Sequence, residues 1–330
     1  MRYHHVDVFS SHPYSGNSLA VFPEADGLSG AQMGQITKEL RHFESIFLVR
    51  RGDAWRARVF DLLGELDFAG HPVIGAACVL HALYGGEDGH TWALQLNARA
   101  VEVSTRRLGL GHYSSLLDQG LAEFIATPDV SRAQVASWFG LTDADLDPTL
   151  PAEVVSTGLR YLVLPVRGDA LPRARIVADI GAGLAALGAE FAYLLDAAAM
   201  EGRHWNNDGL VEDVATGSGA GCVAAYLRSQ RRIGDGQAVI LRQGRFTGRP
   251  SQMTIRAHGE GRGVRSVEIG GDVVLVGEGR LHVLPRPRPG SVTGPTPSPV
   301  PSATRTSSSK SPSASVSASA CGTSPPPSSH

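Results

Sequence analysis

The chain has 330 residues and a formal net charge of −2, with 30 lysines and arginines against 32 aspartates and glutamates. Charge this balanced gives no reason to expect binding to nucleic acid or to an anionic membrane. No run of about 18 apolar residues could span a membrane, and the first residues lack the apolar core of a secretory signal. We therefore expect a cytoplasmic protein, long enough for two domains.

Residues 1–116 predict a first lobe of strands and helices. A helix is expected over residues 29–41 with Ser29 as its N-cap, and another over 72–84 with Pro72 in its first turn. The remaining apolar runs predict strands at 3–9, 19–22, 45–50, 56–62, 65–68, 92–96 and 100–105.

Residues 117–276 predict a second lobe on the same plan. One helix is expected over 218–229, and strands are expected at 154–155, 159–165, 191–196, 238–242, 252–256, 265–269 and 272–276. Residues 277–285 are predicted as a last strand, which a return to the first lobe would place beside it. Residues 286–330 are almost entirely Pro, Ser, Thr, Ala and Gly, a composition that predicts a disordered tail.

An internal match supports two related lobes. Residues 75–83 (GAACVLHAL) and 219–227 (GAGCVAAYL) are identical at five of nine positions. Both segments follow a glycine-bearing turn and open a helix rich in small residues. Two such helices with their N-termini at a shared cleft would suit an acid, because free N–H groups and the positive end of the helix dipole attract an anion.

Three segments carry candidate chemistry. Glu44 leads a mostly apolar strand, where lost solvation would raise its pKa and suit it to acid–base work. His71 stands just ahead of a helix and could shuttle a proton near neutral pH. Asp213, Thr216 and Ser218 surround a glycine turn that could hold an anion. Taken singly, these residues can also be explained as a surface glutamate, a helix-start histidine and helix caps.

Together the segments resemble the PhzF family, which is named for an isomerase of phenazine biosynthesis. The resemblance covers the whole predicted folded part and rests on seven landmarks in order: Val6-Asp-Val-Phe9 with Gly16-Asn17, Phe43-Glu-Ser45, Glu65-Leu-Asp-Phe-Ala-Gly-His-Pro72 with Gly75-Ala76, Ser156-Thr-Gly158, Glu212-Asp-Val-Ala-Thr-Gly-Ser218, Gln243-Gly244 with Gly248-Arg-Pro-Ser251, and Gly270-Gly271.

The resemblance implies a diaminopimelate-epimerase-like α+β fold, with two pseudo-symmetric lobes that each wrap a curved, mostly antiparallel sheet around a central helix. It also implies a homodimer that acts on a small carboxylic acid with no metal and no organic cofactor. The implied catalytic residues are Glu44, His71, Asp213 and Ser218, and the implied substrate-binding residues are Asn17, Gly70, Thr216 and Gly217.

The expected activity is a proton shift between carbons of a small unsaturated ring acid, with Glu44 as general acid–base. The phenazine precursor trans-2,3-dihydro-3-hydroxyanthranilate is one candidate substrate, and a pyrroline carboxylate is another. The family commonly has Ser and Thr where Phe43 and Ser45 flank Glu44, which bears on specificity. Two alternatives stay open: a racemase that uses Cys78 and Cys222 as paired bases, and a binding protein without turnover.

Overall fold

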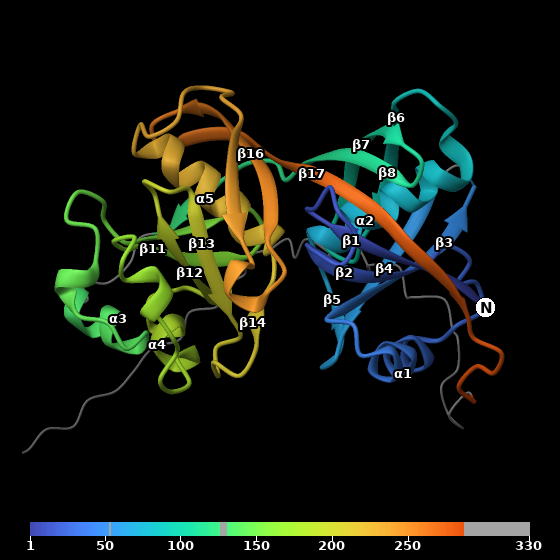
Figure 1. The fold of residues 1–330 in the computed structure, drawn as a ribbon, viewed down its shortest axis with the longest axis horizontal. Helices are drawn as coiled ribbons and strands as arrows, with labels where there is room; N and C mark the ends of the chain where they lie inside the picture. Colours follow the sequence, from blue (N-terminus) through green and yellow to red (C-terminus); the bar gives the residue numbers. More distant parts are fainter. Residues whose placement is uncertain (53, 126–130, 287–330) are drawn as a thin grey trace, which may run out of the picture. The chain divides into compact units, whose positions relative to one another are not determined.

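The computed structural model describes residues 1–52, 54–125 and 131–286 (Figure 1). Apart from Arg286, the predicted tail lies outside these residues. The first half of the chain contains β1 (Arg2–Val8), β2 (Asn17–Phe22), α1 (Gly30–Leu40), β3 (Glu44–Arg51), β4 (Ala54–Asp61), β5 (Glu65–Leu66), α2 (His71–Leu80), β6 (His90–Gln95), β7 (Ala100–Gly109) and β8 (His112–Asp118).

The second half contains β9 (Glu123–Ile125), α3 (Arg132–Trp138), β10 (Glu153–Ser156), β11 (Arg160–Pro165), α4 (Gly181–Ala186), β12 (Phe191–Asp196), β13 (Glu201–Trp205), β14 (Glu212–Asp213), α5 (Gly217–Ser229), β15 (Val239–Gln243), β16 (Ser251–Glu260) and β17 (Gly263–Arg280). Among the described residues no helix is both long enough and apolar enough to cross a membrane.

The two halves repeat one pairing scheme. In the first, β1–β2, β3–β4 and β4–β5 pair antiparallel, whereas β2–β3 and β4–β6 pair parallel. In the second, β10–β11, β12–β13 and β13–β14 pair antiparallel, whereas β11–β12 and β13–β15 pair parallel. The same connections therefore lead to α2 in one half and to α5 in the other, which is the repeat that the sequence match predicts.

Each repeat surrounds one central helix (Figure 1). All ten residues of α2 are buried, and so is most of α5, because both helices are apolar or small on every side. Gly75 shows how closely α2 meets the sheet, since a Cβ there would lie 2.6 Å from Cδ2 of Leu19. By contrast, α1 covers an outer face, and its predicted N-cap is confirmed by a capping box between Ser29 and Gln32.

The strands predicted separately at 265–269 and 272–276 are wrong, because both belong to the single 18-residue strand β17. This strand pairs in turn with β16, β8 and β1, so it links the second half to the first. Gly270 and Gly271 suggested a break but instead permit close crossing. A Cβ on Gly270 would lie 2.3 Å from the backbone oxygen of Ser115, and one on Gly271 would lie 2.9 Å from the Phe9 ring.

Candidate functional site

Glu44 and His71 lie together in the first half of the chain. Glu44 opens β3, and His71 is the first residue of α2. The Oε2 atom of Glu44 is 3.6 Å from Nδ1 of His71, and the side chains are 13% and 5% exposed. Two predicted catalytic residues that are 27 positions apart in the sequence are therefore neighbours at the start of a central helix.

Burial shifts the pKa of both groups in the direction that favours their uncharged forms. Burial raises the pKa of Glu44 well above its usual range, and the negative charges of Asp213 and Asp61 raise it further. Burial lowers the pKa of His71 to about 4, against a smaller opposing effect of Asp213. The His71 imidazole is thus neutral at neutral pH, and burial disfavours an ion pair between the two groups. Within the described residues, Glu44 Oε2 and His71 Nε2 have no hydrogen-bond partner.

Asp213, from the second half, reaches the same place but is fully engaged. Its Oδ1 accepts a hydrogen bond from Nδ2 of Asn17 at 3.0 Å, and its Oδ2 accepts one from the hydroxyl of Thr216 at 2.6 Å. Asn17 donates its second amide proton to the backbone oxygen of Ala215, also at 3.0 Å. The Asn17 amide group therefore ties β2 of the first half to the turn that precedes α5.

The N-termini of α2 and α5 abut at this point. A Cβ on Gly70 would lie 3.2 Å from the backbone nitrogen of Ser218 and 3.3 Å from Cα of Gly217. Neither helix has a side-chain hydrogen bond at its N-cap, which is Gly70 for α2 and Thr216 for α5. Two sets of first-turn N–H groups and two positive helix ends thus converge, an arrangement that favours an anion.

Ser218 stands at the second position of α5, with its hydroxyl 2.8 Å from that of Tyr161. Tyr161 is a buried residue of β11, and burial raises the pKa of its phenol so that it stays protonated. The structure brings all eight predicted site residues to this one region, namely Asn17, Glu44, Gly70, His71, Asp213, Thr216, Gly217 and Ser218. Their individual roles stay predictions.

Three supporting residues were not predicted as site residues: Tyr161, Tyr193 and Gln243. The two tyrosines lie in apolar strand patterns, which do not distinguish a packing aromatic from one that faces a site. Gln243 belongs to one of the landmarks, but nothing in its local sequence indicates that it reaches Asp213, 30 residues away, with a 2.9 Å hydrogen bond to the backbone oxygen.

The two cysteines of the alternative interpretation lie inside the helices. Cys78 is in the last turn of α2, Cys222 is in the second turn of α5, and both are fully buried. Burial raises the pKa of Cys222 to about 12 and that of Cys78 further still. Neither thiol is therefore available as a thiolate base at neutral pH.

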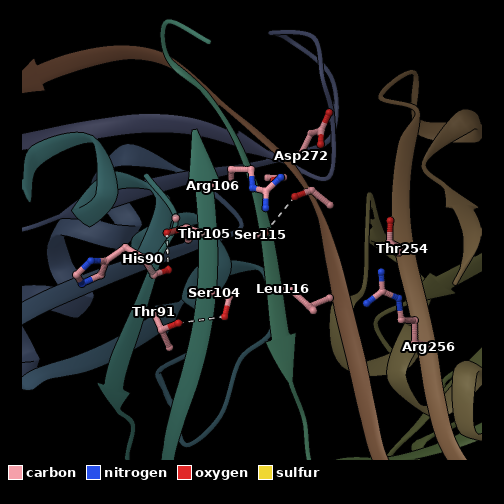
Figure 2. A pocket seen from close by; sticks show the side chains of 13 residues that line it. His90, Thr91, Ser104, Thr105, Arg106, Ser115, Leu116, Thr254, Arg256 and Asp272 are labelled. Carbon is pink, nitrogen blue, oxygen red and sulfur yellow. Dashed lines mark hydrogen bonds between the residues drawn. The ribbon is translucent and has the colours of Figure 1, made fainter. Parts of the chain in front are cut away.

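A separate groove of about 580 Å³ lies over the neighbouring strands β6, β7, β8, β17 and β16 (Figure 2). Its lining is polar: Thr91 and Ser104 share a hydrogen bond of 3.2 Å, and Arg106 and Arg256 stand on its two sides. None of the predicted site residues lines it. The groove and the Glu44 cluster are thus different places on the molecule.

Several known proteins are similar to this chain. The family model described as PhzC-PhzF, phenazine biosynthesis-like protein, matches residues 6–279. A trans-2,3-dihydro-3-hydroxyanthranilate isomerase from Pseudomonas aeruginosa is 33% identical over 300 residues, which cover 86% of this chain and 99% of the relative. A solved structure of a predicted epimerase from the same species is 47% identical with a TM-score of 0.80, over 86% of this chain and 99% of that one.

A probable proline racemase from Agrobacterium radiobacter shares the fold alone, at 14% identity and a TM-score of 0.55 over 85% of this chain and 92% of that one. With the solved structure above, this likeness confirms the predicted diaminopimelate-epimerase-like fold class.

Proposed function

The chain belongs to the PhzC-PhzF family of phenazine biosynthesis-like proteins and is an isomerase, and on this premise we propose a role for Glu44. Glu44 moves a proton between two carbons of a small unsaturated carboxylic acid. The observation that carries this proposal is the buried Glu44 carboxyl with an oxygen that has no hydrogen-bond partner among the described residues, held beside two abutting helix N-termini.

Binding would place the carboxylate of the acid at the N-termini of α2 and α5. The N–H groups near Gly70 and Gly217 point there without side-chain caps, and each helix end adds partial positive charge. This anchoring would hold the carbon that loses its proton near Glu44. Because the anchor is backbone, it would recognise the carboxylate and leave the rest of the acid to be read by side chains.

Proton removal requires the carboxylate form of Glu44. Its raised pKa makes that form a stronger base than an exposed glutamate and makes the protonated form a usable acid near neutral pH. Glu44 takes the proton from a C–H bond next to the unsaturated system, and the electron pair left on carbon delocalises through that system. The helix N-termini stabilise the resulting charge.

Glu44 then delivers a proton to a different carbon, which completes the shift without gain or loss of atoms. Burial of Glu44 and His71 keeps water away, so the proton need not exchange with solvent at every turnover. The neutral His71 imidazole can donate or accept a hydrogen bond to orient the substrate, and Asp213 is held as an acceptor by Asn17 and Thr216.

The identity of the acid is the least constrained part. The relative from P. aeruginosa named trans-2,3-dihydro-3-hydroxyanthranilate isomerase supports that acid as the first to try. Phe43 and Ser45 flank Glu44 where the family commonly has Ser and Thr, so we propose that the site favours a related ring acid of secondary metabolism.

The test is proton NMR in deuterium oxide with trans-2,3-dihydro-3-hydroxyanthranilate and a panel of unsaturated ring acids. Wild type should shift the double bond or introduce deuterium at carbon, and Glu44→Gln should do neither. Glu39→Gln, which removes an exposed carboxylate from α1, is the matched control and should behave as wild type. Tight binding of an acid with no isomerisation or exchange would instead favour a binding protein.

The remaining expectations are also proposals: a homodimer, action in the cytoplasm, and a small acid in place of nucleic acid or a membrane as the partner. Size-exclusion chromatography with light scattering tests the first of these. A mass of one chain at micromolar concentration would contradict the dimer.

A further inference from the structure

Gln243 is buried at the centre of the second half of the site. It is the last residue of β15 and is 1% exposed. Its Oε1 accepts hydrogen bonds from the Tyr193 hydroxyl at 2.9 Å and from the backbone N–H of Thr216 at 3.1 Å. Its Nε2 donates to the backbone oxygen of Asp213 and to the Thr216 hydroxyl oxygen, both at 2.9 Å. One side chain thus makes four hydrogen bonds around the turn that carries Asp213.

The orientation of this amide group is determined by its neighbours. The backbone N–H of Thr216 can only donate and the backbone oxygen of Asp213 can only accept. The oxygen of Gln243 must therefore face the first, and its nitrogen must face the second. The reversed amide would place two donors together and two acceptors together.

The direction of the next hydrogen bond follows. Because the Gln243 nitrogen donates to the Thr216 oxygen, the single hydroxyl proton of Thr216 points away from Gln243. Its other close partner is Oδ2 of Asp213 at 2.6 Å. The sequence of donors therefore runs from Gln243 to Thr216 to Asp213, and Asn17 donates to the second carboxylate oxygen from the other half of the chain.

We propose that Gln243 is a positioning residue of this isomerase, which fixes the hydroxyl of Thr216 so that Asp213 receives hydrogen bonds on both oxygens and remains a pure acceptor beside Glu44. This inference rests on the proposed function. Its consequence for Glu44 is electrostatic: an ionised Asp213 discourages a second negative charge nearby, which agrees with the raised pKa of Glu44.

Gln243→Glu is the sharpest variant because it keeps the shape. At neutral pH the introduced carboxylate still accepts from Tyr193 and from the Thr216 amide, but it cannot donate. The Thr216 hydroxyl should then turn to the new carboxylate, and Asp213 should lose one hydrogen bond. Loss of a hydrogen bond to a charged group predicts a fall in kcat of about 10- to 100-fold, with KM within about threefold.

Two measurements distinguish a role of Gln243 in orienting the Thr216 hydroxyl from a purely structural role. First, a protonated carboxyl regains one donor, so the ratio of variant to wild-type kcat should rise as the pH falls. Second, a crystal structure of Gln243→Glu at neutral pH should show the contact between Thr216 and Asp213, now 2.6 Å, broken. Gln252→Glu adds the same charge at an exposed position of the neighbouring strand and should leave kcat and the pH profile unchanged.

If Gln243→Glu does not fold, Thr216→Val removes the same hydroxyl with little change of volume and should lower kcat to a similar extent. An intact contact between Thr216 and Asp213, or a kcat within threefold of wild type at every pH, would overturn the role of Gln243. Failure of the proposed function looks different: wild type would exchange no acid, whereas the contact in Gln243→Glu would still break.

Discussion

The two halves of the site are built from the same repeat, but the hydrogen bonding of their polar groups differs. In the first half, Glu44 and His71 each keep a buried atom that has no hydrogen-bond partner within the described residues. In the second half, Asp213 accepts hydrogen bonds on both oxygens, and Gln243 holds the turn from behind. In the first half the two groups thus keep free hydrogen-bonding capacity among the described residues, and in the second half the groups are held in place.

The difference follows from what lies behind each helix. Gly75 of α2 packs against the aliphatic side chains of Leu19 and Val8, which cannot form hydrogen bonds. Within the part of the chain that the structure describes, the only hydrogen bond between His71 and β2 is a long one, 3.5 Å between its Nδ1 and Nδ2 of Asn17. The first turn of α5 instead packs against Tyr161 and Tyr193, whose hydroxyls reach Ser218 and Gln243. On the proposed function, one copy of the repeat carries the acid–base group and the other carries a rigid acceptor. The predictions below test that division, beginning with the largest effect.

Replacing the Glu44 carboxyl should nearly abolish proton exchange and should stabilise the folded protein at alkaline pH. Glu44→Gln is expected to lower the exchange rate by about 10²- to 10⁴-fold, the usual contribution of a general acid–base. Because burial raises its pKa, native Glu44 binds its proton more tightly than the unfolded chain does. Its contribution to stability is present below the unfolded pKa and is lost as the pH rises through the folded one.

Glu44→Gln should therefore be more stable than wild type at alkaline pH, and the gap should close on acidification. Thermal unfolding at a series of pH values measures this. A gap that does not depend on pH would mean that Glu44 is better solvated than the structure indicates.

Arg249 connects the second half of the chain to the first, and its replacement measures how much this connection stabilises the fold. Its guanidinium donates to the buried Asp7 carboxylate at 2.7 Å and to the backbone oxygen of Gly16 at 2.8 Å, next to Asn17. Arg249→Met keeps the apolar stem but leaves Asp7, only 1% exposed, without its cation, so we expect a loss of about 3 to 5 kcal/mol of stability in urea unfolding.

Arg245→Met is the matched control, because Arg245 pairs with Glu201 at 2.7 Å but is itself 57% exposed. Its loss should cost no more than about 1 kcal/mol. Equal costs for the two arginines would contradict a special role for the pair between the halves.

His71 should make the protein sensitive to acid. Burial lowers its pKa to about 4, so the unfolded chain binds a proton before the native one does, and stability falls as the pH drops from about 6.5 through about 4. Between pH 7 and pH 5 this contribution amounts to about 2 kcal/mol. The His71→Gln variant should lose correspondingly less on acidification, as measured by chemical unfolding.

His42, whose pKa burial also lowers to about 4, titrates in both proteins and cancels in this comparison. Identical losses of stability in wild type and His71→Gln on acidification would show that His71 is not the buried neutral imidazole described above.

The cysteines should matter least. In a Cys321→Ser background, native protein should resist iodoacetamide, because Cys78 and Cys222 are both fully buried. Cys78→Ala and Cys222→Ala should keep their exchange activity within about threefold, since neither thiol can act as a base while its pKa is raised by burial. Loss of activity on alkylation of the native protein would revive the two-cysteine alternative.

The sequence indicated which residues lie together better than it indicated how they are connected. Glu44, His71 and Asp213 stand in recognisable local settings, a strand start, a helix start and a glycine turn, so their order along the chain indicated a common region. The hydrogen bond between Asn17 and Asp213 joins positions 196 apart, and no local pattern encodes such a pairing. The same holds for Gln243, whose importance lies in the turn that it meets.

The strand assignments failed for a related reason. Gly270 and Gly271 are breakers when considered locally, yet β17 continues through them because a neighbouring backbone and the Phe9 ring occupy the space of a side chain. Similarly, the helix predicted over 72–84 leaves regular α geometry after Leu80 and continues as a π-helical turn to Gly85.

The most direct test of the division between the halves compares two carboxylates in one experiment. Deuterium incorporation at carbon should be measured by NMR for wild type, Glu44→Gln and Asp213→Asn with an acid that the wild type converts. We expect incorporation to vanish in Glu44→Gln and to persist, at a reduced rate, in Asp213→Asn. Persistence in Glu44→Gln together with loss in Asp213→Asn would contradict the account, because the proton would then be carried by the half that the structure describes as held in place.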